Sequence, residues 1–162
     1  MFPTELTDLA TEVLEKARAN GLKIATAESC TGGLVAACLT EISGSSDVVE
    51  RGFVVYSNAA KIELLGVPSE TIAIHGAVSE DVAKALAQGA IAKSRATLSV
   101  AITGIAGPGG GSADKPVGLV HFAAKRAGRN TVHERHEFGD IGRSNVRLAA
   151  VKVALRLLSE CL

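Results

Sequence analysis

Strand-like and helix-like segments alternate along the first two thirds of this chain, and that alternation is the strongest constraint on its fold. Apolar residues recur at helical spacing from Leu6 to Ala17, and Gly21 follows as a helix stop. A mostly apolar run near 23–27 is typical of a buried strand, and a helical pattern follows near 31–42. Such alternation predicts an α/β protein whose largely parallel sheet is covered by helices on both faces.

The rest of the chain continues this alternation and then changes it. The remaining strand patterns lie at 52–56, 97–102, 117–124 and 131–138. The remaining helical patterns lie at 58–66, 79–94 and about 141–158, with Asp140 as a candidate cap for the last. Because the final two strand patterns are consecutive, we expect a mixed sheet. At 162 residues, the chain fits one domain.

The composition argues against several classes of protein. The chain is 47% hydrophobic but only 3% aromatic, so its core must be mostly aliphatic. Its formal net charge is zero, which gives no sign of a nucleic-acid partner or a membrane surface. No apolar run approaches the roughly 18 residues that span a bilayer, and the first residues lack signal-peptide features. Three cysteines without Cys-x-x-Cys spacing fit reduced thiols, so we expect a cytoplasmic protein.

A hydroxyl-rich turn between a strand and a helix is the first candidate for chemistry. Residues 27–33 read Ala-Glu-Ser-Cys-Thr-Gly-Gly, which places Ser29 beside two glycines that allow close approach to the backbone. Backbone N–H groups at a helix start favour a phosphate or a developing oxyanion. Ser29 is therefore a candidate nucleophile, although serine and threonine in such turns also serve as plain helix caps.

Lys61 is the candidate base. If Asn58 caps the next helix, Lys61 stands at the third helical position, where the helix dipole disfavours a positive charge. A free lysine has a pKa of about 10.4, and burial would lower it further toward the range of a general base. The alternative is an ordinary solvated lysine. Tyr56, the only tyrosine, could relay a proton or orient Lys61, or it could be a core ring.

Two further features could bind an anion. Residues 103–112 carry five glycines after a strand, and their N–H groups could form an anion-binding nest or belong to a flexible connection. The loop is neither a Walker A motif nor a dinucleotide fingerprint, since no Gly-Lys-Ser/Thr closes it and a strand follows it. Arg143, in the first turn of the last helix, could pair with Asp140 or hold a phosphate.

A metal site is not expected. His133 and His136 are three residues apart in a predicted strand, so they face opposite sides, and the His-Glu-x-x-His motif is absent. We also expect no cofactor.

Six ordered motifs closely resemble those of the CinA C-terminal domain family. They are 27–33, 44–46, 52–58 with Lys61, 75–79, 103–108 and 115–118, and the resemblance covers nearly the whole chain. The resemblance implies a three-layer α/β/α sandwich in a single amidase domain, residues 1–162, which often forms homodimers. Within the family the chain is similar to the stand-alone nicotinamide-nucleotide amidases, which implies conversion of nicotinamide mononucleotide to nicotinate mononucleotide and ammonia. The N-terminal domain of longer members is expected to be absent.

This resemblance and the residues together predict a metal-free Ser/Lys mechanism. Ser29 attacks the carboxamide, Lys61 takes its proton, and Tyr56 or Ser46 relays or orients that proton. Ser46 is also the main competitor for the nucleophile, although its loop feeds the wrong end of its strand. The expected substrate-binding residues, some of which would supply oxyanion donors, are Thr31, Gly32, Gly33, Asn58, Thr103, Gly104, Gly107 and Arg143. The alternative function is a non-catalytic nucleotide-binding module.

Overall fold

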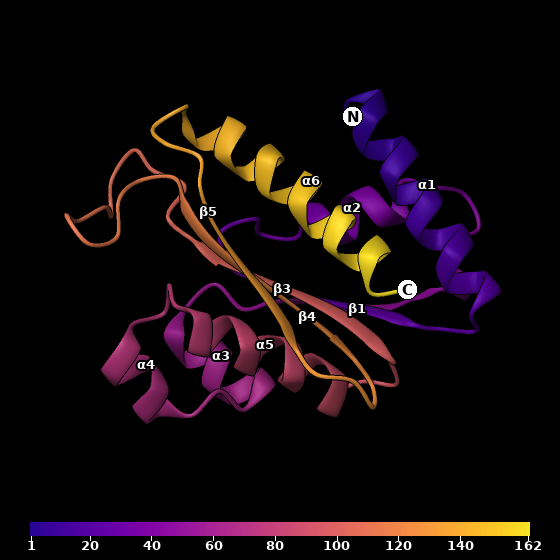
Figure 1. The fold of residues 1–162 in the computed structure, drawn as a ribbon, viewed down its shortest axis with the longest axis horizontal. Helices are drawn as coiled ribbons and strands as arrows, with labels where there is room; N and C mark the ends of the chain where they lie inside the picture. The colour runs from indigo at the N-terminus through magenta and orange to yellow at the C-terminus, as the bar shows by residue number, and fades with distance from the viewer.

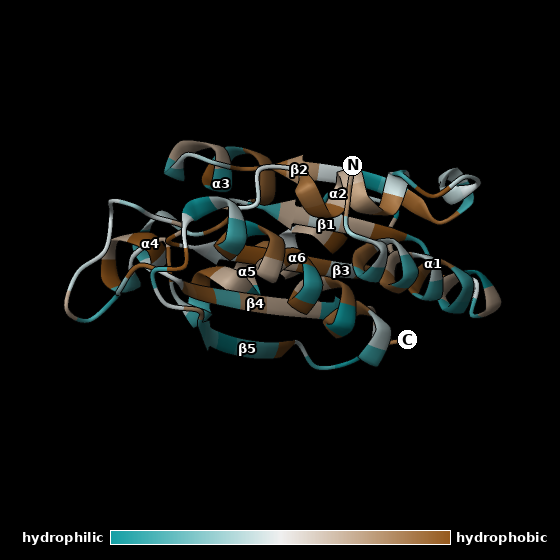
Figure 2. Ribbon diagram, turned by 90° about the horizontal axis from the view of Figure 1, so that it is seen from above, coloured by the Kyte–Doolittle hydropathy of each residue, from teal (hydrophilic) through white to brown (hydrophobic).

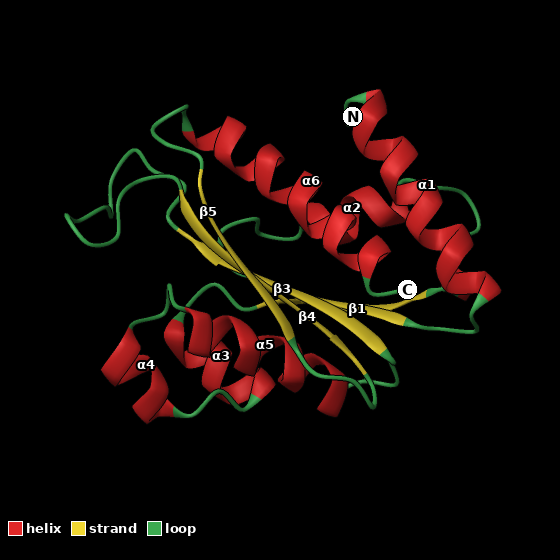
Figure 3. Ribbon diagram, viewed as in Figure 1, coloured by secondary structure: helices red, strands yellow, loops and turns green.

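The computed structural model describes residues 1–162, which form a five-stranded sheet between two layers of helices (Figures 1 and 3). One layer contains α1 (Thr4–Ala19), α2 (Leu34–Thr40) and α6 (Arg143–Glu160). The other contains α3 (Asn58–Leu65), α4 (Ser69–His75) and α5 (Glu80–Ala92). A short 3-10 helix, η1 (Ser45–Asp47), precedes the second strand. The predicted three-layer α/β/α arrangement is confirmed.

The sheet is mixed, as the sequence predicts. Its strands are β1 (Ile24–Glu28), β2 (Val49–Val54), β3 (Leu98–Gly104), β4 (Leu119–Arg126) and β5 (Val132–Glu137), in the order β2-β1-β3-β4-β5. The pairs β2–β1 and β1–β3 are parallel, and the pairs β3–β4 and β4–β5 are antiparallel. The edge strand β5 is mostly hydrophilic, as its teal colour in Figure 2 shows. The parallel part of the sheet thus consists of β2, β1 and β3, with β1 in the middle.

Aliphatic packing on both faces of the sheet holds the layers together. A large cluster joins α1, α2 and α6 to one face, and a smaller cluster joins α5 to the other. Every residue of β1 is buried, as expected for a strand covered on both sides. No helix has both the length and the apolar character needed to cross a bilayer.

Some boundaries differ from the sequence prediction for local reasons. Helix α2 begins at Leu34 and not near 31, because Gly32 and Gly33 adopt φ values of 59° and 100°. Helix α4 was not predicted, since it has no buried residue and hence no apolar periodicity. Asp140 does not cap α6, which begins after Gly142 without a side-chain cap.

The carboxyl ends of β1, β2 and β3 meet at one edge of the sheet. Ser29, Val55 and Ile105 directly follow these three ends. The loop between β3 and β4 and the start of α6 lie at this same end of the molecule (Figure 1). In parallel sheets this edge is where ligands usually bind, so the fold gathers the predicted site residues there.

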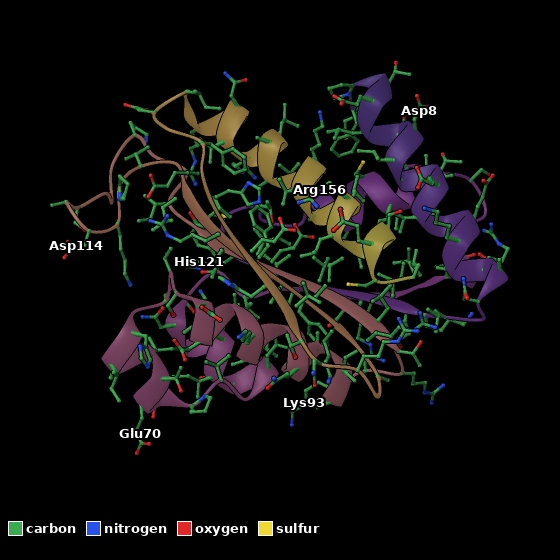
Figure 4. All side chains as sticks on the ribbon, viewed as in Figure 1. Asp8, Glu70, Lys93, Asp114, His121 and Arg156 are labelled. Carbon is green, nitrogen blue, oxygen red and sulfur yellow. The ribbon has the colours of Figure 1, made fainter.

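A histidine pair lies on β4 and β5. His121 Nδ1 is 2.9 Å from His133 Nε2, and the two rings are stacked. His133 Nδ1 is in turn 3.6 Å from a carboxylate oxygen of Glu80 on α5. Figure 4 labels His121 between the sheet and the layer of α3, α4 and α5. Burial, with a smaller contribution from His133, lowers the pKa of His121 to about 4.

Acid should therefore destabilise the protein through His121. The pKa of His121 in the folded state lies below its unfolded value of about 6.5. The unfolding free energy that depends on neutral His121 is therefore fully present above about pH 6.5 and is lost as pH falls toward 4. We expect His121 to account for about 3 kcal/mol of lost unfolding free energy between pH 7 and 4. Urea unfolding of His121→Gln should show a flatter pH dependence than the wild type. The exposed His75→Gln is the control, and an unchanged slope in His121→Gln would contradict the assignment.

Candidate active site

Ser29 and Lys61 meet in the interior of the protein. Lys61 Nζ is 3.1 Å from Ser29 Oγ, although the residues are 32 positions apart in the chain. Ser29 stands in the turn between β1 and α2, and Lys61 stands on α3. Lys61 is 1% exposed and Ser29 is 8% exposed. The structure thus pairs a hydroxyl with an amine largely out of contact with bulk water.

The surroundings of Lys61 favour its neutral form. Its Nζ donates hydrogen bonds to the carbonyl oxygens of Val55, at 3.0 Å, and Tyr56, at 3.2 Å. No carboxylate forms an ion pair with it, and burial lowers its pKa. A neutral amine has two N–H donors and one lone pair. The two carbonyls take the two donors, so the lone pair is left to accept the hydroxyl proton of Ser29.

The start of α3 sets the position of Lys61. Ser57, not Asn58, is the N-cap, and its Oγ accepts a hydrogen bond of 3.0 Å from the Ala60 N–H. The prediction that Asn58 caps the helix is therefore wrong: Asn58 is the first helical residue and Lys61 the fourth. Both serine and asparagine are good caps, and the point at which the chain leaves β2 decides between them.

Glu28 organises the turn that carries Ser29, a role the sequence analysis missed. Its carboxylate is fully buried and accepts hydrogen bonds from the N–H groups of Gly33, Val35 and Ala36. The Gly32 N–H donates to the Ser29 carbonyl. These N–H groups are engaged within the protein, so Gly32 and Gly33 do not offer the free donors that the sequence analysis expected. A glutamate at the end of a buried strand was the available signal.

A cavity of about 200 Å³ opens onto Ser29 and Lys61. Its lining includes seven residues predicted for the site: Ser29, Lys61, Tyr56, Asn58, Thr103, Gly104 and Arg143. It also includes Cys30, Ala77, Val78 and Ala106. Thr31, Gly32 and Gly33 are not part of the lining, and neither is Gly107. The backbone N–H groups of Cys30, Ala77, Val78 and Ala106 donate to no acceptor in the protein, so they are available donors in the cavity lining, and Cys30 is the residue next to Ser29.

The Tyr56 side chain lies at the mouth of this cavity and not against Lys61. It is 60% exposed, and its hydroxyl accepts a hydrogen bond of 3.0 Å from Arg143. A second Arg143 nitrogen donates to the Gly107 carbonyl at 2.8 Å, and no ion pair joins Arg143 to Asp140. Tyr56 therefore positions Lys61 through its carbonyl, while Arg143 connects two sides of the cavity entrance.

Thr103 shapes the cavity wall through its side chain. Its Oγ1 donates a 2.8 Å hydrogen bond to the Ala77 carbonyl, which ties β3 to the segment before α5. This hydroxyl is engaged within the protein, although Thr103 was predicted to bind substrate.

Ser46 lies away from the site. It belongs to η1, beside the start of β1, where the Ile24 N–H donates to the Val48 carbonyl. Four residue steps of about 3.3 Å put this end of β1 about 13 Å from the end that leads to Ser29. An ion pair between Arg18 and Asp47, with an N–O distance of 2.6 Å, holds η1 there. The proposed contact of Ser46 with Lys61 is therefore not formed, and the hydroxyl that contacts the Lys61 amine is that of Ser29.

Cys30 is the other nucleophilic side chain at the cavity. Burial raises its pKa to about 12, so at neutral pH it is a protonated thiol. No group of three or more histidine, cysteine, aspartate or glutamate side chains is placed to hold a metal ion. The chemistry that the geometry supports best is therefore attack by the Ser29 hydroxyl with Lys61 as base.

Comparisons with known proteins agree on one family. The model of the CinA C-terminal domain matches residues 6–162. The chain is 49% identical over 159 residues to nicotinamide-nucleotide amidohydrolase PncC of Escherichia coli, covering 98% of this chain and 95% of that protein. It is 54% identical over 143 residues to a CinA-like protein of a Mycobacterium species, covering 88% of this chain but only 34% of that protein.

Solved structures show the same fold. The competence/damage inducible protein CihA from Agrobacterium tumefaciens superposes with a TM-score of 0.96 at 54% identity, covering 98% of this chain and 96% of that chain. A competence-damaged protein (CinA) superfamily protein from Escherichia coli superposes with a TM-score of 0.92 at 33% identity, covering 100% and 94% of the two chains.

Proposed function

Because the chain belongs to the CinA C-terminal domain family, as its motifs predicted, we propose that it is a nicotinamide-nucleotide amidohydrolase. It converts nicotinamide mononucleotide to nicotinate mononucleotide and ammonia. The observation that carries the mechanism is the 3.1 Å contact between Lys61 Nζ and Ser29 Oγ. The near full-length identity to a nicotinamide-nucleotide amidohydrolase supports the substrate.

The reaction proceeds through an acyl-enzyme. Ser29 Oγ attacks the carboxamide carbon while Lys61 Nζ takes the hydroxyl proton, giving a tetrahedral intermediate. The C–N bond then breaks, and Lys61 returns the proton to the departing nitrogen, which leaves as ammonia. Water attacks the resulting ester with Lys61 again as base, and nicotinate mononucleotide and free Ser29 are released. The N–H groups of Cys30 and Ala106 stabilise the oxyanion, each contributing about 3 kcal/mol.

An ammonia assay tests the proposed function. Purified protein is mixed with nicotinamide mononucleotide in the presence of EDTA, and ammonia and nicotinate mononucleotide are measured. We expect stoichiometric release of both, unchanged by chelation. Binding of the nucleotide without release would favour the non-catalytic binding module, and activity restored only by an added metal would contradict the metal-free mechanism.

The pH profile should report Lys61. Only the neutral amine can accept the Ser29 proton, and burial lowers the pKa of Lys61 below its ordinary value. We therefore expect kcat/KM to rise with pH and to level off at an apparent pKa below that of free lysine. A rise that follows the ordinary lysine pKa would show that burial does not tune the base.

Arg143 and the glycine loop are the proposed phosphate site. Arg143 stands at the cavity mouth, where its guanidinium can exchange its contacts for a phosphate. The N–H groups of Gly107, Gly109, Gly110 and Gly111 donate to no acceptor in the protein. Nicotinamide mononucleotide carries the phosphate that these donors would bind.

The phosphate of the substrate should consequently contribute more to kcat/KM than its nicotinamide base. We expect free nicotinamide, and the riboside that lacks the phosphate, to be poor substrates. Arg143→Ala should lose most of the preference for the nucleotide, because one charge-assisted contact contributes about 2–3 kcal/mol, or roughly 30- to 150-fold. Comparing kcat/KM for nucleotide and riboside measures this, with the exposed Arg135→Ala as control. A full preference in Arg143→Ala would place the phosphate on the backbone between Gly104 and Gly111.

Compartment and assembly are also part of the proposal. The three cysteines are free, which fits a reducing cytoplasm. We expect a homodimer, as the family resemblance implies, and sedimentation measurements would give the mass directly.

A further inference from the structure

Arg147, on α6, contacts the backbone carbonyls of the Ser29 turn. Its Nε donates to the Cys30 carbonyl and its Nη2 to the Thr31 carbonyl, each at 3.1 Å. The guanidinium is partly buried and forms no ion pair with a carboxylate. Arg147 therefore directs its two hydrogen bonds, and an uncompensated charge, at the two residues that follow the nucleophile.

These contacts fix the backbone of the turn. Ser29 is held by its own N–H, which donates to Ile102, and by its carbonyl, which accepts from Gly32. Along the chain, the carbonyls of Cys30 and Thr31 lie between Ser29 and Gly32, the residues that these two hydrogen bonds hold. Because a peptide unit is planar, holding the Cys30 carbonyl also sets the direction of the whole peptide that joins it to Thr31. Glu28 holds N–H groups of the turn and Arg147 holds two of its carbonyls, which leaves the N–H groups of Cys30 and Thr31 without an acceptor in the protein. Of these two residues, only Cys30 lines the cavity.

We propose that Arg147 is a positioning residue for the reaction: it holds the Cys30–Thr31 backbone so that Ser29 Oγ and the Cys30 N–H keep their geometry toward the carboxamide. The inference rests on the proposed Ser29–Lys61 amidase. Arginine suits this role because its planar guanidinium stays charged and offers fixed donors in two directions.

Arg147 is not needed to dock α6 on the protein. Its helix neighbours Val146, Ala150 and Val151 are fully buried in the large aliphatic cluster. These contacts should hold the helix in place when the guanidinium is removed. A loss of activity in an Arg147 variant can therefore be separated from a loss of fold.

The test compares Arg147→Met with the wild type by two readouts. One is kcat and KM for nicotinamide mononucleotide, and the other is the rate at which a fluorophosphonate probe modifies Ser29, followed by intact mass. We expect both kcat and the labelling rate to fall about 100-fold, the typical effect of a small displacement of reacting groups, while KM changes little. The apparent pKa of the labelling rate, which reports Lys61, should not move.

Two further variants sharpen the test. Arg147→Ala should regain part of its labelling rate when guanidinium is added at a non-denaturing concentration, which a purely structural role would not produce. Arg156→Met removes an arginine from the same helix away from the site, where it pairs with Glu134 and Glu160, and should label at the wild-type rate (Figure 4 labels Arg156). Wild-type labelling in Arg147→Met, or an Arg147→Ala loss that guanidinium does not restore, would overturn the proposal.

If Arg147→Met does not fold, Arg147→Lys decides the question. It keeps the charge but cannot reproduce the paired donors, so we expect labelling about tenfold slower than the wild type. Labelling at the wild-type rate would overturn the proposal. A wild-type protein that labels at Ser29 but releases no ammonia would instead contradict the proposed function and leave the positioning role open to the same measurements.

Discussion

Replacing Lys61 with arginine or methionine will reduce ammonia release by about 10²- to 10⁴-fold, the usual contribution of a general base. Arginine keeps the positive charge but does not deprotonate in proteins, so it cannot accept the Ser29 proton. Methionine has a similar length and removes the amine altogether. Initial rates with nicotinamide mononucleotide measure the loss.

The fold should survive the methionine substitution. Lys61 is buried without a carboxylate partner, and burying an ammonium without one is costly. We therefore expect the melting temperature of Lys61→Met to equal or exceed that of the wild type, which circular dichroism can measure. A Lys61→Arg enzyme with a near-normal rate would eliminate Lys61 as the base.

Ser29→Ala will remove essentially all activity, while Ser46→Ala will keep it. The Ser29 hydroxyl lies 3.1 Å from Lys61 Nζ, and no other side-chain hydroxyl donates to or accepts from that amine. Ser46, at the opposite end of β1, serves as the matched serine control. Equal rates for Ser29→Ala and the wild type would require a different nucleophile.

Local patterns were sufficient for the secondary structure other than helix α4, and for the central pair of residues. Ser29 and Lys61 could be selected because each follows a strand that ends at the same sheet edge. The strand before Ser29, β1, is buried as expected, whereas the strand before Lys61, β2, is an edge strand with no buried residue. The number of layers and the mixed sheet follow from the order of strand and helix patterns. The family resemblance added the substrate class.

What the sequence could not predict depends on three-dimensional geometry, whether the residues are near or far apart in the chain. The capture of three N–H groups by Glu28 requires α2 to fold back over the end of β1. The contacts of Arg147 require α6, more than 100 residues away, to pack beside the same turn. The pairing of His121 with His133 depends on the register of β4 and β5. None of these contacts leaves a periodic signal.

Ser46 shows why a nearby motif can mislead. The loop that contains Ser46 precedes β2, the strand that leads to Lys61. The two ends of a strand are separated in space by the full length of the strand, so a residue before β2 lies far from a residue after it. The direction of the loop after α2, which the ion pair between Arg18 and Asp47 holds, decides that Ser46 stays at the far end. Sequence proximity therefore gave no information on distance from the site.

Trapping the acyl-enzyme tests the central claim most directly. Wild-type protein is quenched in acid during turnover of nicotinamide mononucleotide, digested and examined by fragment-resolved mass spectrometry. The Ser29–Lys61 mechanism predicts a nicotinate mononucleotide ester on Ser29, distinguished by fragmentation from the adjacent Cys30 thiol, and no adduct in Lys61→Met. An adduct on Ser46 or on Cys30, with Ser29 unmodified, would contradict it.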